Sequence, residues 1–355
     1  MQWMDDYKKK VVTADEAVRH IKSGDRVVFG HAAGEPKVLV EALVRNASLY
    51  KNVEIVHMVA LGKGEYCNPE YVENFTHNAL FAGASTRKAI AEGRAIFTAC
   101  HFSRIPSLFK DKVLPVDVAL IMVSTPDEHG YCSYGVSVDY TKPAAECAKI
   151  VIAEVTPNMP RTYGDSFIHV SEIDYIVESD STPALLNPPT LTETDEKIGK
   201  YIAELINDGD CLQLGIGAVP DAILNFLTDK KNLGIHSEMF SDGVVTLVEK
   251  GVINCSKKNF HPGKMVVTFL MGSERLYKFA NNNPMIEMYP VDYVNNPSVI
   301  AQNDNMVSVN SALQVDFTGQ VVSDTIGYKQ YSGTGGQLDF VRGASWSKNG
   351  RSILA

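Results

Sequence analysis

Glu238 is the residue of this chain best placed by its surroundings to act as a nucleophile. It lies in the segment Gly-Ile-His-Ser-Glu-Met-Phe-Ser-Asp-Gly at 234–243, just after a short apolar run, 233–235, that we expect to be a strand. Two glycine-rich turns, at 215–220 and 332–337, supply backbone N–H groups to the same place if the strands lie side by side. A carboxylate with such donors around it predicts an acyl-transfer site.

Each of these signals also has an ordinary structural explanation. An isolated glutamate is usually a surface residue, because an ionised carboxylate is rarely buried without a partner. The turn Gly-Ile-Gly-Ala-Val-Pro at 215–220 lacks the third glycine of the dinucleotide fingerprint, and packing explains it equally well. The turn Gly-Thr-Gly-Gly at 333–336 also fits a tight connection, although its glycines let backbone approach a ligand closely. A position at a strand end favours a functional role for Glu238, since open α/β sheets bind their ligands there.

Three polar side chains occupy places where either a structural or a functional role is possible. His31 follows the expected strand 27–29, and Gln213 lies within the apolar run 211–214. Asn295 belongs to a short Tyr-Val-Asn-Asn-Pro segment that also fits a plain turn. A buried polar group needs hydrogen-bond partners, so each of these residues either bonds to the surrounding protein or faces the site.

The composition predicts an ordinary globular protein of two domains. The chain has 355 residues, of which 45% are hydrophobic and 21% are charged. Its longest apolar stretches, such as 116–123, are far shorter than a bilayer span, and its amino terminus lacks the pattern of a signal peptide. We therefore expect a cytoplasmic protein that does not bind a membrane.

The charge and the cysteines exclude several other classes. A net charge of −9 without a basic stretch beyond Lys8–Lys10 argues against a nucleic-acid partner. The 6 cysteines form no Cys-x-x-Cys pair, and the histidines show no metal-binding spacing. We expect reduced thiols, no metal and no redox chemistry.

The chain repeats one pattern in its two halves. A segment with helical spacing, a Gly-Asp pair, an apolar run, a proline-led helix and a Lys-Asn pair follow one another twice. The matching segments are 15–21 and 198–206, Gly24-Asp25 and Gly209-Asp210, 27–29 and 211–214, 35–43 and 219–227, and Lys51-Asn52 and Lys231-Asn232. We expect Gly24 and Gly209 to end helices in the left-handed cap conformation and the apolar runs to be buried strands.

This repeat predicts an α/β fold with two similar open, mostly parallel-sheet domains that arise from an internal duplication. The proline-containing segment 180–189 disfavours both helix and central strand and is the expected join. We therefore expect an N-terminal domain of residues 1–185 and a C-terminal domain of residues 186–355.

Each half also carries an expected hairpin, around 127–130 in the first and 316–319 in the second. Counted from the Lys-Asn pairs, the first-half position that matches Glu238 is Met58. Only the second copy therefore holds a carboxylate at this place.

Several segments of the chain match a known family in order and from end to end. They are 14–17 (Ala-Asp-Glu-Ala), 22–27, 62–66, 215–221, 236–239 (His-Ser-Glu-Met), 241–245, 289–294 and 335–343 (Gly-Gly-Gln-Leu-Asp-Phe-Val-Arg-Gly). With them the chain resembles the acetyl-CoA hydrolase/transferase branch of the class I CoA-transferases. Members of this family usually continue for several dozen residues beyond the position of Ala355, with a lysine and a Thr-Glu-x-Gly segment near the site. We therefore expect the C-terminal domain to be truncated in this sequence.

The resemblance implies a role for each residue singled out above. Glu238 is expected to become a glutamyl-CoA thioester in a ping-pong transfer of CoA between short-chain carboxylic acids, such as 4-hydroxybutyrate or butyrate with acetate. Acyl-CoA and these acids are the expected partners, CoA is a substrate, no cofactor is tightly bound, and a homodimer is expected. The residues implied to contact CoA are Gly215, Ile216, Gly217, Ala218, Val219, Ala312 and Gly335. Gly335 and Asn295 are expected to take part in catalysis, whereas His31, Gln213 and Asn295 are implied to line the substrate pocket.

Two other functions remain open at this point. A CoA-ester hydrolase would use the same glutamate, with water intercepting the enzyme thioester. A non-catalytic sugar-phosphate or CoA-binding module would share the open α/β fold, although Glu238 and the lack of a DNA-binding region weigh against a sensor. Product analysis with and without an acceptor acid separates the CoA-transferase from the hydrolase.

Overall fold

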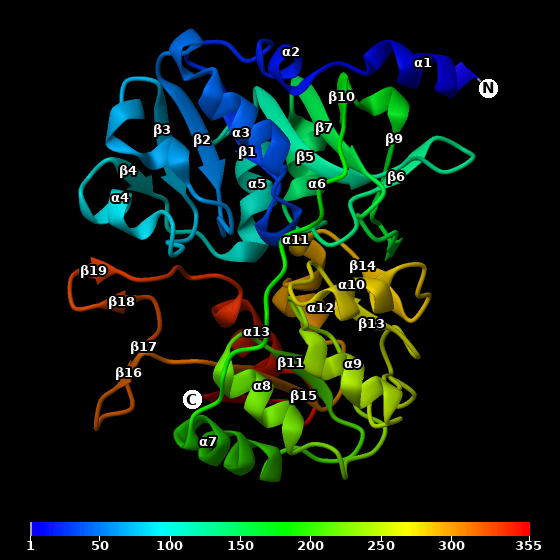
Figure 1. Ribbon diagram of the computed structural model, residues 1–355. Helices are drawn as coiled ribbons and strands as arrows, with labels where there is room; N and C mark the ends of the chain where they lie inside the picture. The colour runs from blue at the N-terminus through cyan, green and yellow to red at the C-terminus, as the bar shows by residue number, and fades with distance from the viewer. Residues whose placement is uncertain (1) are drawn as a thin grey trace.

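The first half of the chain forms a seven-stranded parallel sheet in the computed structural model, which describes residues 2–355 (Figure 1). In spatial order the strands are β10 (Tyr175–Glu178), β7 (Ile150–Thr156), β5 (Val118–Ser124), β1 (Arg26–Phe29), β2 (Val53–His57), β3 (Phe75–Ala79) and β4 (Ala95–Phe97). Every neighbouring pair in this sheet is parallel. The expected run of apolar residues at 27–29 is therefore the end of a central strand.

Alternate residues of β1 face opposite sides of the sheet, and both sides are covered. Val27 and Phe29 pack in a cluster with α2 (Ala14–Val18) and α3 (Lys37–Arg45). Val28 instead belongs to the cluster that includes residues of two other helices, α5 (Ile105–Lys110) and α6 (Thr141–Cys147). Burial on both faces explains why this parallel strand is apolar throughout and shows no polar alternation.

The second half builds a sheet with the same strand order. Parallel strands β20 (Arg351–Leu354), β15 (Met306–Asn310), β11 (Cys211–Leu214) and β12 (Gly234–Ile235) are followed by β13 (Met265–Val267), β14 (Ile286–Met288) and β8 (Tyr163–Gly164). A parallel bridge between His236 and Val266 joins the two groups. The order β15-β11-β12-β13-β14 matches β5-β1-β2-β3-β4 of the first sheet. The predicted α/β class with two similar, mostly parallel sheets is confirmed.

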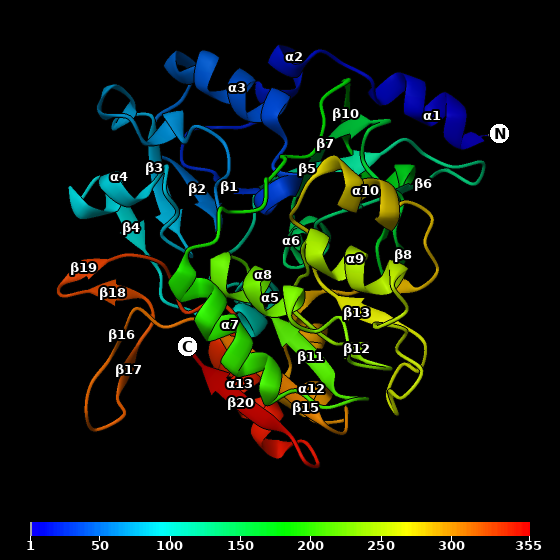
Figure 2. The same cartoon turned by 60° about the horizontal axis from the view of Figure 1, so that its bottom comes forward.

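The remaining elements cover the sheets or project from them (Figures 1 and 2). The helices are α1 (Gln2–Lys10), α4 (Arg87–Ala91), α7 (Glu193–Glu204), α8 (Ala218–Asn225), α9 (Asp242–Glu249), α10 (Glu274–Ala280), α11 (Val291–Val294), α12 (Pro297–Ile300) and α13 (Gln337–Trp346). The antiparallel pairs are β6 (Tyr131–Ser133) with β9 (Phe167–His169), β16 (Gln314–Val315) with β17 (Val321–Val322), and β18 (Thr325–Ile326) with β19 (Lys329–Gln330). Within the described part of the chain, none of the helices is both long and apolar enough to span a bilayer.

The repeated Gly-Asp turns have the same hydrogen bonds in both halves. The N–H of Gly24 donates to the carbonyl of Lys51 at 3.0 Å, and that of Gly209 donates to Lys231 at 2.9 Å. Both glycines adopt the left-handed conformation, with φ of 84° and 81°. They do not cap helices, because α2 and α7 end several residues earlier. The expectation of helix caps was wrong: each glycine instead forms the turn that leads into a strand.

The hairpins expected around 127–130 and 316–319 differ in outcome. The turn at Asp316 joins the antiparallel strands β16 and β17, which confirms the second one. The turn at Asp127 leads into β6, but β6 pairs with β9 and not with β5, so the first expectation was wrong in its pairing. In both turns the aspartate accepts the N–H groups two and four residues later.

The proline-containing segment 180–189 forms neither helix nor strand, as expected. Its backbone contacts both halves, since Ala184 donates to the carbonyl of Ala33 and Leu186 donates to that of Gly272. We keep the division at residue 185 as a proposal.

The matched turns predict matched stability effects. An added Cβ meets nothing within 4 Å at Gly24, and its nearest neighbour at Gly209 is Lys257 Cβ at 3.7 Å. Only the positive φ then opposes a side chain, so Gly24→Ala and Gly209→Ala should each lower the free energy of unfolding by about 1 kcal/mol. Chemical denaturation measures both, and the Asn variants should lose less. An unchanged midpoint in either Ala variant would contradict the shared turn geometry.

Candidate active site

Glu238 lies three residues beyond β12, at the carboxyl ends of the second sheet's strands, as the sequence predicts. Its carbonyl oxygen accepts the N–H groups of Thr268 at 3.0 Å and Phe269 at 3.2 Å, which follow β13. The next residue, Met239, bridges to Leu214 at the end of β11. The backbone of Glu238 is thus fixed between the ends of two strands.

Two donors from distant segments hold the carboxylate of Glu238. Asn295, which directly follows α11, donates from Nδ2 to Oε2 at 2.7 Å. The backbone N–H of Gly336, just before α13, lies close enough to lower the pKa of the same carboxyl group. A Cβ at Gly336 would lie 1.8 Å from Oε2 of Glu238 and 2.2 Å from Nδ2 of Asn295, so only glycine fits there.

The surroundings disfavour the charge on Glu238. Burial raises the pKa of its carboxyl to about 8, and the hydrogen bond from Asn295 acts in the opposite direction. The nearby carboxyl groups of Asp339 and Asp139 raise this pKa further, whereas the Gly336 amide lowers it. A carboxylate with a raised pKa is more basic, and hence a stronger nucleophile once it is ionised.

The downstream glycine turn contacts Glu238 through Gly336, one residue after Gly335. Gly335 has a φ of 51°, and its carbonyl accepts the N–H of Phe102 at 2.9 Å. A Cβ at Gly335 would meet only the Phe81 ring, at 3.8 Å. The sequence therefore identified the turn, but the residue that has no room for a side chain is Gly336. A catalytic role for Gly335 stays a prediction.

His31 is linked to Glu238 through one intervening residue, Phe269. Its buried ring has Nδ1 3.2 Å from Oδ2 of Asp139 and packs edge-on against Phe269, whose N–H binds the Glu238 carbonyl. Among the residues that the structure describes, Nε2 of His31 has no hydrogen-bond partner. His31 therefore borders the site, and its contact with substrate stays a prediction.

Gln213 has structural partners. Its buried amide exchanges two hydrogen bonds with the amide of Asn310, at 3.2 and 3.1 Å. Ala312, two residues after Asn310, donates its N–H to the carbonyl of Ala355 at 2.8 Å. The hydrogen bonds with Asn310 favour the structural explanation for Gln213. The ligand contacts expected for Gln213 and Ala312 stay predictions.

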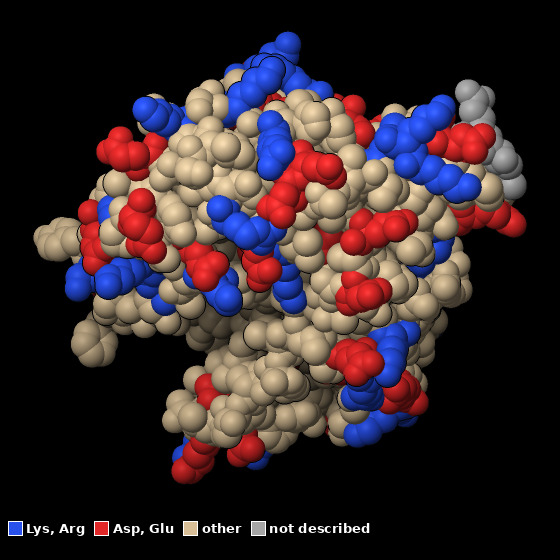
Figure 3. Space-filling model, turned by 45° about the horizontal axis from the view of Figure 1, so that its top comes forward, with Lys and Arg blue, Asp and Glu red and all other residues tan. Residues whose placement is uncertain are grey.

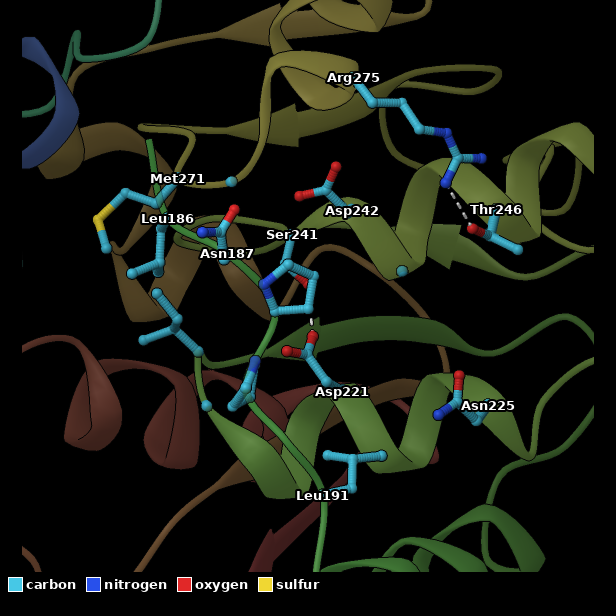
Figure 4. Close-up of a pocket in the computed structure, with 16 residues that line it drawn as sticks. Leu186, Asn187, Leu191, Asp221, Asn225, Ser241, Asp242, Thr246, Met271 and Arg275 are labelled. Carbon is cyan, nitrogen blue, oxygen red and sulfur yellow. Dashed lines mark hydrogen bonds between the residues drawn. The ribbon is translucent and has the colours of Figure 1, made fainter. Parts of the chain in front are cut away.

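The upstream glycine turn borders a pocket of about 440 Å³ (Figure 4). Of the predicted CoA-contacting residues, Ile216 and Gly217 line it, Ala218 and Val219 begin α8, and Gly215 directly follows β11. Other parts of its lining come from the end of the proline-containing segment 180–189, including Leu186, and from Met271 and Arg275. The remaining lining residues are Asn187, Pro188, Pro189, Leu191, Asp221, Asn225, Ser241, Asp242, Gly243, Thr246 and Gly272.

The charged side chains of this pocket are two carboxylates, Asp221 and Asp242, and one arginine, Arg275, whose charge is neutralised by an ion pair. Ser241 donates to the carboxylate of Asp221 at 2.8 Å, as Figure 4 shows, and Arg275 forms an ion pair with Glu249 at 2.5 Å. Asp242 accepts the N–H of Ser273 at 2.8 Å. The walls thus fit an uncharged, partly apolar ligand segment better than a phosphate.

The other groups around the site carry no metal-binding pattern. In residues 2–355, no three His, Cys, Asp or Glu side chains lie close enough together to hold a metal ion. Basic and acidic side chains are interspersed over the face drawn in Figure 3. The residues that sequence analysis missed are Asp339, Asp139 and Phe269. Asp339 lies just after the glycine turn 333–336, whose amides had been singled out as donors.

Comparison with known proteins gives matches along the chain. Residues 1–187 match the acetyl-CoA hydrolase/transferase N-terminal domain, and residues 272–355 match the C-terminal domain of the same name. The chain is 63% identical over its full length to a 4-hydroxybutyrate coenzyme A transferase of Clostridium kluyveri, of which it covers 83%. It is 45% identical to a succinyl-CoA:cyclohexane-1-carboxylate CoA transferase of Geobacter metallireducens, with 98% of this chain and 79% of the relative covered.

Solved structures agree with these matches. A 4-hydroxybutyrate CoA-transferase from Porphyromonas gingivalis is 44% identical, with a TM-score of 0.86 over 99% of this chain and 82% of that one. RipA from Yersinia pestis is 36% identical, with a TM-score of 0.95 over 100% of this chain and 83% of that one. The matches of sequence and fold cover both sheets and the carboxylate between them, and the chain therefore belongs to the acetyl-CoA hydrolase/transferase family of CoA-transferases.

Proposed function

We propose that this enzyme moves CoA between short-chain carboxylic acids by a ping-pong mechanism, through a glutamyl-CoA thioester at Glu238. The observation that carries the proposal is the carboxylate of Glu238, held between the Asn295 amide and the Gly336 N–H at the strand ends. A nucleophile fixed by two donors is what acyl transfer requires, because the same donors meet the charge of the tetrahedral state.

The proposed reaction begins and ends with a thioester. An oxygen of Glu238 attacks the carbonyl carbon of acyl-CoA, the C–S bond breaks, and a mixed anhydride and CoA thiolate form. The thiolate then attacks the Glu238 carbonyl carbon, the bridging C–O bond breaks, and the first acid leaves as its carboxylate. A second carboxylate reverses both steps on the enzyme thioester. Since a thioester is exchanged for a thioester, the reaction needs no ATP.

Burial of Glu238 favours the covalent intermediate. The ionised carboxylate is costly in this environment, as its raised pKa of about 8 shows, whereas a glutamyl thioester carries no charge. When the thiolate attacks the Glu238 carbonyl, the Glu238 oxygen beside Asn295 and Gly336 becomes negative, and each such donor contributes roughly 3 kcal/mol in other oxyanion sites. Binding of the remote parts of CoA supplies further energy to bring its thiolate to this carbon.

For the substrates, we assign CoA to the turn at 215–219 and to the pocket beside it. The apolar walls and the carboxylates Asp221 and Asp242 suit the uncharged pantetheine arm. Ala312 and Gly335 are assigned to the same CoA side, and His31 to the acid side. Relatives named for 4-hydroxybutyrate, butyrate and acetate support acids of this size. CoA is thus a substrate, no further cofactor is assigned, and a homodimer is the proposed assembly.

The direct test is a mass spectrum of the enzyme after incubation with acyl-CoA. We expect a CoA adduct on the peptide that contains Glu238, and borohydride should inactivate the enzyme only after acyl-CoA has been added. Glu238→Gln should form no adduct and lose at least about a thousandfold in turnover, because the nucleophile is gone.

Controls separate this reaction from its rivals. Circular dichroism should show that the Gln variant is folded. A tenth of wild-type turnover in that variant would exclude Glu238 as the nucleophile, and an adduct that is hydrolysed to free CoA over many turnovers without any acceptor acid would identify a hydrolase. Intersecting initial-rate lines would contradict the ping-pong order.

The two adjacent glycines should respond differently to a methyl group. Gly336→Ala should lower kcat by roughly a hundredfold or more, because its Cβ would displace the Glu238 carboxylate and the Asn295 amide. Gly335→Ala should act mainly on stability, since its Cβ has space but its φ of 51° is strained. Turnover and melting temperature are measured for both variants. A large loss of turnover in Gly335→Ala with only a loss of stability in Gly336→Ala would place the chemistry at Gly335.

The raised pKa of Glu238 predicts a pH-dependent stability difference. The folded-state pKa of about 8 lies above the ordinary value of 4.5, so the folded protein holds this proton more tightly. The corresponding stabilisation is complete below pH 4.5 and is lost as pH rises through 8. Glu238→Gln, which mimics the protonated acid, should therefore gain a few kcal/mol in unfolding free energy over wild type between pH 5 and 9. Denaturation of both proteins across this range measures it, and parallel curves would show an unperturbed carboxyl.

A further inference from the structure

A buried carboxylate in the first turn of α13 bonds to the other half of the molecule. Asp339 is only 4% exposed, yet both of its oxygens accept hydrogen bonds from one residue of the first half. The N–H of Ser103 donates to Oδ2 at 3.1 Å, and the Ser103 hydroxyl donates to Oδ1 at 2.8 Å. Both donors belong to an uncharged residue, and the net effect of the surroundings is still to raise the pKa of this carboxyl group, chiefly through burial.

A third hydrogen bond lies beside these two. Phe102 precedes Ser103 in a short 3₁₀ turn, and its N–H donates to the carbonyl of Gly335 at 2.9 Å. The turn 102–104 of the first half is therefore bonded to both ends of the segment 335–339 of the second half. Gly336, whose N–H meets the Glu238 carboxylate, lies between these two attachment points.

On this basis, and resting on the proposed function, we propose that Asp339 is a positioning residue for the transfer reaction. With Ser103, it holds the glycine turn at the distance from Glu238 at which the Gly336 N–H meets the reacting oxygen. Neither side chain touches Glu238 in a hydrogen bond, so both act through the backbone of the turn.

The charge of Asp339 has a second effect that provides a separate readout. It raises the pKa of Glu238, as does Asp139 on the other side. The pKa of Asp339 is itself raised by burial and lowered by the Ser103 hydrogen bonds and by the charges of His101 and Arg342. Removal of the Asp339 charge should thus move the ionisation of Glu238 to lower pH.

The test compares three variants of the full chain with wild type. Asp339→Asn can still accept the Ser103 N–H and can donate to the Ser103 hydroxyl, so it keeps the attachment but not the charge. We expect its kcat to stay within about threefold of wild type and the lower pH midpoint of kcat/KM to fall by roughly half a unit to one unit. Asp339→Ala should lower kcat by roughly ten- to a hundredfold with KM for acyl-CoA little changed, because small displacements of a catalytic donor are costly. Ser103→Ala should lie between them.

A matched control is available at Asp210. This aspartate is also buried, at 3% exposure, but it lies before β11, at the opposite strand ends, where it accepts the Asn207 N–H and pairs with Arg351. Asp210→Ala should lower the melting temperature while the folded enzyme keeps its kcat. Equal kcat for Asp339→Ala and Asp210→Ala below their melting temperatures would overturn the positioning role, and an unchanged pH profile in Asp339→Asn would overturn the effect of its charge on Glu238.

The rate of CoA adduct formation at Glu238, measured by mass spectrometry in a single turnover, keeps this inference separate from the proposed function. If the adduct forms in wild type and forms more slowly in Asp339→Ala, the result supports both the proposed function and the positioning role. An adduct that forms at the same rate in both proteins overturns the positioning role alone. No adduct in wild type overturns the proposed function and this inference with it.

Discussion

The free-energy cost of holding a carboxylate largely away from water organises this molecule. Glu238 is partly buried and has two further acidic groups nearby, so its charge is disfavoured. Only an amide side chain and a backbone N–H stabilise it, and each is delivered by a different segment. The ends of β11 and β13, the residue after α11 and the turn before α13 must therefore all be correctly placed at once. This requirement explains why the site is built where the two halves meet and not on one exposed loop.

The duplicated architecture assigns different tasks to two similar sheets. The first half places Met58 where the second places Glu238, and Met58 is buried. The first half contributes instead the turn 102–104 and the His31–Asp139 pair, which lie behind the reacting group. One copy thus carries the nucleophile and the other helps to position it. A substitution in the first half can then affect chemistry without touching a reacting atom.

Local sequence patterns predicted the strands, the open parallel sheets and the strand-end position of Glu238, because these follow from hydrophobic period and from glycine and proline positions. The helix caps expected at Gly24 and Gly209 were wrong, since tertiary hydrogen bonds to Lys51 and Lys231 decide those turns. The amides of the turn 333–336 were expected near Glu238, but the bond of Ser103 to Asp339 was not predictable. It joins residues 236 positions apart, and no local pattern encodes such a separation.

The short strand β8 has a consequence for how the chain folds. It belongs to the first half in sequence but forms the edge of the second sheet, where Tyr163 pairs with Glu287. One buried apolar cluster also runs through both halves. The two sheets are therefore not separable modules, because the first half of the chain supplies an edge strand of the second sheet. A fragment that begins after residue 185 would lack β8 and would expose the backbone of β14. Such an open edge is a template for pairing with other chains, so we expect the isolated second half to aggregate.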